Sequence, residues 1–388
     1  GVLCSIPWMA SKSILRDFFS DVPDPRVERT RKHQLNDVIL IVLIGMITGC
    51  RSWSDMHWFV EMGPPEIREM LELPNGVPSK DTLRRVISAL NPGAFRDGFI
   101  GWAQSLCKST KGKLVAIDGK TVRGARRDGD GFGALHLVNA WVKENAITLG
   151  QYATDVKSNE ITAIPELLKL LSLEGAIVSM DAMGCQKEIA KEVRAQGADY
   201  LFGLKKNQPS LHKEVLGAFG KETCRALELT PGGFHESNDK GHGRIEKRRT
   251  WVLHDVEWLT MSDSWKDLKS LVLVESQRTL KGETTTELRA YISSLVAPAK
   301  RMNELVRGHW EVENNLHWVL DVTFGEDHTR VSKRNGAENL ALIRKMALNM
   351  IKHTPVNGRS SSLVMRQRLA SRRPNYLRQV LSAGITED

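Results

Sequence analysis

The sequence predicts an α/β fold, in which a mixed β-sheet with a β-rich insertion follows an all-helical N-terminal domain and precedes a basic helical C-terminal segment. Apolar residues recur at helical spacing as far as about residue 107, whereas from residue 114 they form short strand-like runs. These runs first adjoin one another and then alternate with helices, which is typical of a mixed sheet covered by helices. The third observation is charge. Residues 329–388 contain twelve Lys or Arg and three acidic residues, which accounts for the whole net charge of +9 and indicates a polyanion contact.

Composition narrows the class of protein. The 388 residues are 41% hydrophobic and 26% charged, which is typical of a globular chain with two or three domains. The five cysteines are scattered and form no CxxC motif, which favours a reduced cytoplasmic protein without a zinc ribbon. The longest apolar run, residues 38–47, is shorter than the roughly 20 residues of a membrane span, so we expect a buried core helix and no membrane contact.

The N-terminal domain is expected to span residues 13–107 and to be all-helical. Its helices are indicated by the periodicity of LNDVILIVLIGMI, SDMHWFVEM and PSKDTLRRVISAL, of which the last begins with the cap residues Ser79 and Asp81. We interpret residues 1–12 as a leader or a scar and assign no structure to them.

The second domain is expected to span residues 114–328. It begins with the elements strand, strand, strand, helix, strand, helix and strand, at residues 114–117, 135–142, 147–152, 158–171, 176–180, 186–196 and 200–204. Asp118 and Asp181 each follow a buried strand, and the carboxyl ends of parallel strands are where the chemistry of such sheets is found. A desolvated acid there needs a cationic partner, and a metal ion is the simplest one, although either aspartate alone also fits a turn or a helix cap.

The later part of this domain is expected to contain a β-rich insertion at about residues 209–300, followed by a long helix over 302–320. On that helix we expect Trp310 and Trp318 to pack into the core and Glu313 to point inward. Three acids come from separated elements, namely Asp118, Asp181 and Glu313. A site that binds two divalent metal ions and acts on a phosphodiester needs such a set of acids.

Glu326 and Asp327 are interpreted as a solvated turn. The sequence contains no Walker loop, GxGxxG after a strand, or GxSxG motif, which argues against nucleotide hydrolysis, dinucleotide redox chemistry and a serine hydrolase.

The chain closely resembles the H-repeat-associated proteins, a branch of the bacterial insertion-sequence transposases that use a DDE catalytic triad. The resemblance covers about residues 15–383. It rests on the strings KHQLNDVIL (32–40), GVPSKDTLRRV (76–86), AIDGKTVRGA (116–125), KSNEITAIPELL (157–168), DAMGCQKEIA (181–190), DYLFGLKKNQ (199–208), GHGRIEKRR (241–249), AYISSL (290–295) and HWEVENNLHWVLDVTFGED (309–327).

The resemblance implies a ribonuclease-H-like core, with strand cleavage and strand transfer at the ends of an insertion sequence. It implies the triad Asp118, Asp181 and Glu313, with two Mg²⁺ or Mn²⁺ ions as cofactor. Double-stranded DNA, as element ends and as target, is the implied partner, and we expect a homodimer because two ends are held together. Related transposases carry a Tyr-x2-Arg-x3-Glu-x6-Lys signature around the last acid, and its other places here hold Val306, His309 and Leu320.

Contacts to DNA are expected from basic and polar residues near the acids and in the insertion, each of which also fits a solvated loop or hairpin. The candidates are Lys120, Arg123, Lys205, Lys206, Asn207, Arg244, Arg248, His309, Asn314 and His317. The helical N-terminal domain, with PRVERTRKH at residues 25–33, is the candidate reader of the element ends. The alternatives are a catalytically silent DNA-binding relic and a nuclease that cleaves without joining.

Overall fold

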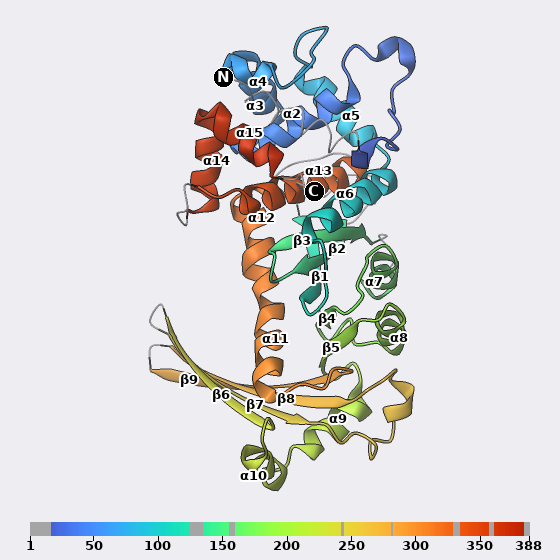
Figure 1. Ribbon diagram of the computed structural model, residues 1–388, viewed down its shortest axis with the longest axis vertical. Coiled ribbons are helices and arrows are strands. Elements are labelled where there is room, and N and C mark those ends of the chain that lie inside the picture. The colour runs from blue at the N-terminus through green and yellow to red at the C-terminus, as the bar shows by residue number, and fades with distance from the viewer. Residues whose placement is uncertain are drawn as a thin grey trace, which may run out of the picture.

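We analysed a computed structural model of the chain (Figure 1). It describes residues 17–123, 135–154, 160–241, 244–280, 282–328, 334–356 and 361–383. The predictions for residues 1–12 and for the cap of the helix at residues 158–171 lie outside these residues.

One nine-stranded mixed sheet forms the centre of the molecule, in the order β3-β2-β1-β4-β5-β9-β8-β7-β6. Its strands are β1 (Leu114–Val122), β2 (Leu135–Val142), β3 (Ile147–Ala153), β4 (Ile177–Met180), β5 (Asp199–Leu204), β6 (Phe234–Gly241), β7 (Arg244–Leu253), β8 (Ser270–Leu280) and β9 (Glu283–Ser293). β1, β2 and β3 are antiparallel neighbours, whereas β4 runs parallel to β1 and β5 runs parallel to β4. The predicted order of strands and helices up to residue 204 is therefore confirmed.

Helices cover both faces of this sheet. Helices α7 (Glu160–Lys169) and α8 (Lys187–Ala195) lie on one face, and α11 (Ala299–Val312) crosses the other (Figure 1). The alternation of side chains along the strands explains this arrangement. Val115, Ile117 and Val178 belong to the main apolar core with α7 and α8, whereas Leu114 and Ile177 pack with α11.

The insertion differs from its prediction in two respects. It begins with two helices, α9 (Pro209–Ala218) and α10 (Lys221–Leu229), before its four strands. It is also continuous with the central sheet, because β9 pairs antiparallel with β5 from Leu201↔Ser293 to Leu204↔Ala290. The insertion thus lengthens the sheet on the side away from β3, as the lower part of Figure 1 shows.

The N-terminal and C-terminal helices pack together at the other end of the molecule. They are α2 (Leu35–Thr48), α3 (Trp53–Met62), α4 (Pro65–Arg68), α5 (Lys80–Ala89), α6 (Pro92–Cys107), α13 (Arg334–His353), α14 (Leu363–Arg372) and α15 (Pro374–Ser382). We call these eight helices the helical body. Helix α2 is buried from Asp37 to Thr48 and α13 packs against it, against α5 and against α6. Among the described residues, no single helix is long and apolar enough to span a membrane, and only the pair α2 and α3, bent by 96°, reaches that length and composition together.

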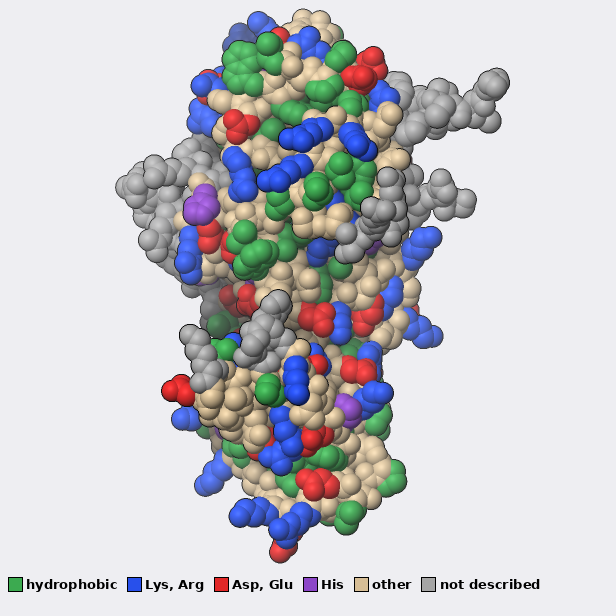
Figure 2. Space-filling view, turned by 90° about the vertical axis from the view of Figure 1, so that its left-hand side faces the viewer, with side chains coloured by type: hydrophobic (Ala, Val, Ile, Leu, Met, Phe, Trp, Pro, Cys, Tyr) green, Lys and Arg blue, Asp and Glu red, His purple; other side chains and the backbone are tan. Residues whose placement is uncertain are grey.

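The basic C-terminal segment is therefore part of the folded body. Arg344 and Lys345 on α13 are buried, and the Arg366 guanidinium donates to the carbonyl oxygens of Ile351 and Thr354 at 2.9 and 3.2 Å. These three cations are held within the fold and are not presented to a polyanion. Arg368, Arg372 and Arg373 remain exposed. Figure 2 shows Lys and Arg side chains gathered on the face of the helical body to which α14 and α15 contribute.

Candidate active site

Asp118 and Asp181 lie at the same level of two neighbouring parallel strands. The register of β1 and β4 ends with Ile117 opposite Met180, so the next residue along each strand is one of the two aspartates. β1 does not stop at residue 117 as predicted. It continues to Val122 in antiparallel pairing with β2, where Asp118 lies opposite Asn139, so Asp118 is held inside a strand while Asp181 begins a loop.

Glu313 and His317 come from a wide helical turn. Residues 302–320 were predicted as one regular helix, but α11 ends at Val312 and a π-helical turn over Glu313–His317 precedes α12 (Trp318–Val322). A π-turn closes i→i+5 hydrogen bonds and occurs often at functional sites. Its wider turn places residues four apart almost above one another, and the His317 Nδ1 lies 3.4 Å from a Glu313 carboxylate oxygen.

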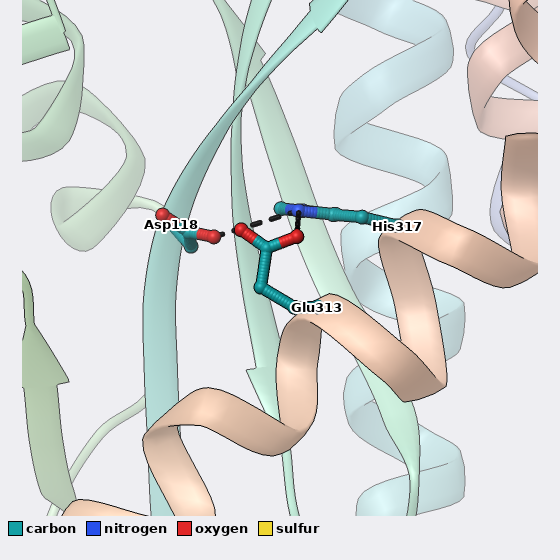
Figure 3. Close-up of side chains that lie close together, drawn as sticks. All are labelled: Asp118, Glu313 and His317. Carbon is teal, nitrogen blue, oxygen red and sulfur yellow. Dashed lines mark ion pairs between the residues drawn. The ribbon is translucent and has the colours of Figure 1, made fainter. Parts of the chain in front are cut away.

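These two side chains point at Asp118 across the edge of the sheet (Figure 3). The His317 Nδ1 lies 3.5 Å from the Asp118 Oδ2, so the imidazole is shared by the two carboxylates. Ligand atoms of Asp118, Glu313 and His317 all lie within 4.8 Å of one another, which is close enough to hold one metal ion. The His317 side chain is 7% exposed, and its buried Nε2 has no hydrogen-bond partner among the described residues.

The electrostatics of this cluster favour a cation. Burial, together with the negative charges of Glu313 and Asp181, raises the pKa of Asp118 to about 7, although His317 and the Gly119 N–H act in the opposite direction. The hydrogen bond with His317 lowers the pKa of Glu313, whose side chain is 55% exposed. Asp181 accepts hydrogen bonds from the N–H groups of Met183 at 3.0 Å and Gly184 at 3.4 Å. A single imidazole thus lies between two of the three acids, Asp118 and Glu313.

A carboxylate that the sequence analysis did not select lies beside them. Glu160 is in the first turn of α7, and its carboxylate approaches the Cα of Gly119, the residue after Asp118. The charge of Asp181 acts on it. Its sequence context, an acid at the start of a helix, is equally typical of a favourable contact with the helix dipole, so no sequence signal distinguished it.

Besides His317, which was also expected to contact DNA and is buried beside Asp118 and Glu313, two of the expected DNA contacts are buried inside the fold. The Lys120 ammonium binds the carboxylates of Asp321 and of Glu326, the latter at 2.8 Å. The His309 Nδ1 lies 2.9 Å from the Ser179 hydroxyl, and burial lowers the pKa of His309 to about 4, so the ring is neutral. Neither side chain is presented to DNA in this structure.

Glu326 corrects the interpretation of its segment as a solvated turn. Its side chain is fully buried, and the charges of Lys345, Lys120 and Arg344 hold its pKa below the usual range in spite of the burial. Asp327 does lie partly exposed, and its carboxylate accepts the N–H of Arg123 at 3.1 Å. The residues that neutralise Glu326 are far from it in sequence, so local pattern could not reveal them.

Both tryptophans expected in the core are exposed instead. Trp310 is 40% and Trp318 is 58% exposed. The Arg289 guanidinium lies over the Trp310 ring, 4.4 Å from its centre. Trp318 follows the π-turn, which rotates the later residues away from the face that a regular helix would give them.

The remaining candidates for DNA contact are distributed around the site. Lys205, Lys206 and Asn207 are exposed in the turn after β5, and the Asn207 amide donates to the Ala182 carbonyl at 2.5 Å, which fixes this turn beside Asp181. Arg123 and Asn314 are also exposed.

In the insertion, Arg248 pairs with Glu246 on its own strand. The backbone of Arg244 belongs to β7, and its side chain lies outside the described residues.

Comparison with known proteins shows the family of the chain. A family model described as "Transposase DDE domain" matches residues 109–350, and one described as "DDE_Tnp_1-associated" matches residues 16–103. The chain belongs to the DDE transposase family.

Its relatives carry matching names. The "Putative transposase YncI" of Escherichia coli O157:H7 is 38% identical over 89% of this chain and 88% of the relative. The "H repeat-associated putative transposase YhhI" of Escherichia coli (strain K12) is 36% identical over 95% of this chain and 98% of the relative. These confirm the resemblance to the H-repeat-associated branch. Among solved structures, a piggyBac transposase synaptic complex with hairpin DNA aligns over 94% of this chain and 76% of that one, with 12% identity and a TM-score of 0.40.

Proposed function

We propose that this DDE transposase cleaves DNA strands at the ends of an insertion sequence and joins them to target DNA at Asp118, Asp181 and Glu313. The observation that carries the proposal is the convergence of these acids from β1, from the loop after β4 and from the π-turn after α11. They lie on one edge of a sheet whose strand order suits a ribonuclease-H-like core. The like charges of Glu313 and Asp181 act on Asp118, and a bound cation would reduce this repulsion.

The donor set fits Mg²⁺ or Mn²⁺. Carboxylate oxygens are the preferred ligands of these hard cations, and three acids can serve two ions if Asp118 is shared between them. Asp118 and Glu313 would hold one ion, and Asp118 and Asp181 the other. When bound, such a pair of ions activates a nucleophile and stabilises the leaving oxygen of a phosphodiester. His317 positions Asp118 and Glu313 through its contacts with both carboxylates.

The chemistry is two successive exchanges of one phosphorus–oxygen bond for another. In the first, a water oxygen bonds to the phosphorus at the element end and the bond to the 3′-oxygen breaks, which leaves a 3′-hydroxyl and a 5′-phosphate. In the second, that 3′-hydroxyl oxygen bonds to a target phosphorus, and the target's own 3′-oxygen leaves with a proton. Neither exchange needs a covalent bond to the protein.

The turn after β5 is suited to bind the DNA strand next to the acids. Lys205 and Lys206 are exposed there, and Asn207 ties the turn to the segment after Asp181. Arg123 lies at the end of β1 with its side chain exposed. We assign backbone contacts to these cations, since phosphate contacts position DNA without reading its sequence.

The helical body offers a separate groove for the element ends. Among the described residues, a cavity of about 560 Å³ is lined by basic, polar and apolar side chains, namely those of Arg26, Arg29, Thr30, Lys32, His33, Thr82, Arg85, Val86 and Ala89. Burial lowers the pKa of His33, and the charges of Arg26 and Lys32 lower it further, against Asp37. Because this positive field suits a phosphate backbone, the groove supports the assignment of residues 25–33 to end binding. Two ends held in one complex imply two copies of the chain on DNA.

The test is cleavage of a plasmid that carries the native element ends, with Mg²⁺ or Mn²⁺ added. Glu313→Gln should abolish cleavage. Glu311→Gln is the matched control, because Glu311 lies two residues earlier on α11 and pairs with Lys143 at 3.3 Å, away from the acids. Equal loss in both variants, or equal cleavage, contradicts the proposal. Binding without cleavage by the wild type identifies the catalytically silent relic.

A further inference from the structure

The carboxylate of Glu160 is packed directly against the backbone of the active-site strand. A Cβ atom added to Gly119 would meet both carboxylate oxygens of Glu160, at 2.1 and 2.3 Å, and its carboxyl carbon at 2.2 Å. Only a residue without a side chain lets an acid come so close to β1 at this position. The close approach of the carboxylate to β1 therefore depends on both Gly119 and Glu160, which are 41 residues apart in the sequence.

Glu160 reaches the edge of the sheet from the face opposite to Glu313. Side chains alternate along β1, so Gly119 presents the face covered by α7 and α8, whereas Asp118 presents the face crossed by α11. The acids thus surround the end of β4 from both sides.

Within the described part of the chain, burial and a neighbouring acid both act against the charge of Glu160. Burial raises its pKa and the charge of Asp181 raises it further, while His136 and His317 act in the opposite direction. No Lys or Arg of the described residues pairs with it. The His317 Nδ1, at 3.5 Å from Asp118 and 3.4 Å from Glu313, is the imidazole nitrogen that faces the acids, whereas its buried Nε2 has no hydrogen-bond partner in the described part of the chain.

We propose that Glu160 is a fourth metal-binding carboxylate, which holds one of two divalent cations together with Asp118 and Asp181. This inference rests on the proposed function and deepens it. Asp118, Glu313 and His317 form the tight cluster of the first ion. Asp181 and Glu160, which lie outside that cluster and act on each other, then form the other half of the site. The sequence triad alone supplies only two carboxylates to this second ion, and Glu160 supplies a third.

The test is calorimetric titration of the full-length chain with Mn²⁺ in the absence of DNA. The wild type should bind two ions. Glu160→Gln should retain one and bind the other more weakly by roughly 10- to 100-fold, since losing even an indirect ligand contact costs about that much. Glu166→Gln is the matched control, because Glu166 lies on the same helix and pairs with Lys169 at 2.8 Å. It should bind both ions as the wild type does.

A second series of variants separates metal binding from a folding defect. Gly119→Ala leaves all four acids in place, yet it should weaken the second ion because the new Cβ displaces the Glu160 carboxylate. In a Glu160→Ala background the same change should have no further effect, since nothing is left to displace.

Two results would overturn the inference. One is Glu160→Gln with two Mn²⁺ ions bound at wild-type affinity while Asp118→Asn loses them. The other is an equal effect of Gly119→Ala in both backgrounds. A wild type that binds no Mn²⁺ would instead refute the proposed function itself.

Discussion

Replacing Asp118 by Asn should stabilise the metal-free protein at neutral and alkaline pH. The structure places the pKa of Asp118 at about 7, against 3.8 for the unfolded chain, so folding disfavours the ionised carboxylate. The unfolding free energy of the wild type therefore falls as pH rises from about 4 to about 7 and stays low above that. A difference of about three pH units corresponds to about 4 kcal/mol. An Asn side chain at position 118 cannot ionise, so the variant does not lose this stability as the pH rises.

The assay is urea or thermal unfolding between pH 4 and pH 8, in EDTA and in Mg²⁺. In EDTA the Asp118→Asn variant should match the wild type at pH 4 and exceed it by up to about 4 kcal/mol at pH 8. Mg²⁺ should stabilise only the wild type and close the gap. Asp81→Asn is the control, because Asp81 is exposed beside Arg84. A variant less stable than the wild type at pH 8 in EDTA, or a gap that does not change with pH, would refute the reasoning.

Three further outcomes follow from the packing and charge of other residues. Lys120→Met should lower the unfolding free energy by roughly 3 kcal/mol in urea titrations, because it leaves the buried Glu326 without its direct partner; an unchanged midpoint would contradict this. Asn339→Ala should cost about 1–3 kcal/mol by the same assay, since the Asn339 amide donates to two buried carbonyl groups that link α13 to α5. Arg29→Ala and Arg85→Ala should each lower the slope of log affinity against log salt by about 1 in DNA-binding anisotropy, and an unchanged slope would place the end contact outside the groove.

The central sheet was predictable because each of its first five strands is marked by a short apolar run in the sequence. Short apolar runs and their order along the chain are enough to give three adjoining strands and then alternating helices, and the acid after β4 marks its end. Asp118 and Asp181 could be chosen together because neighbouring parallel strands end at one edge. The N-cap role of Ser79 was also visible, and its hydroxyl accepts the Thr82 N–H at 3.3 Å.

What the sequence did not reveal depends on contacts between distant segments. The π-turn at Glu313–His317 adds a residue to one helical turn, and nothing in the periodicity of residues 302–320 records it. In the sequence, Lys120 and Glu326 have the pattern of solvated loop charges, whereas in the structure they form a buried ion pair. Glu160 has the sequence context of an ordinary first-turn acid, and only the folded structure shows its carboxylate beside Gly119 of β1.

The measurement that tests the central claim most directly is strand cleavage and joining on DNA with the native ends, by wild type and by Asp118→Asn. The account predicts that the wild type, with Mg²⁺ or Mn²⁺, yields free 3′-hydroxyl ends and joined products, and that the variant yields neither while it still binds the ends. Cleavage that survives in Asp118→Asn would contradict a metal site at this residue.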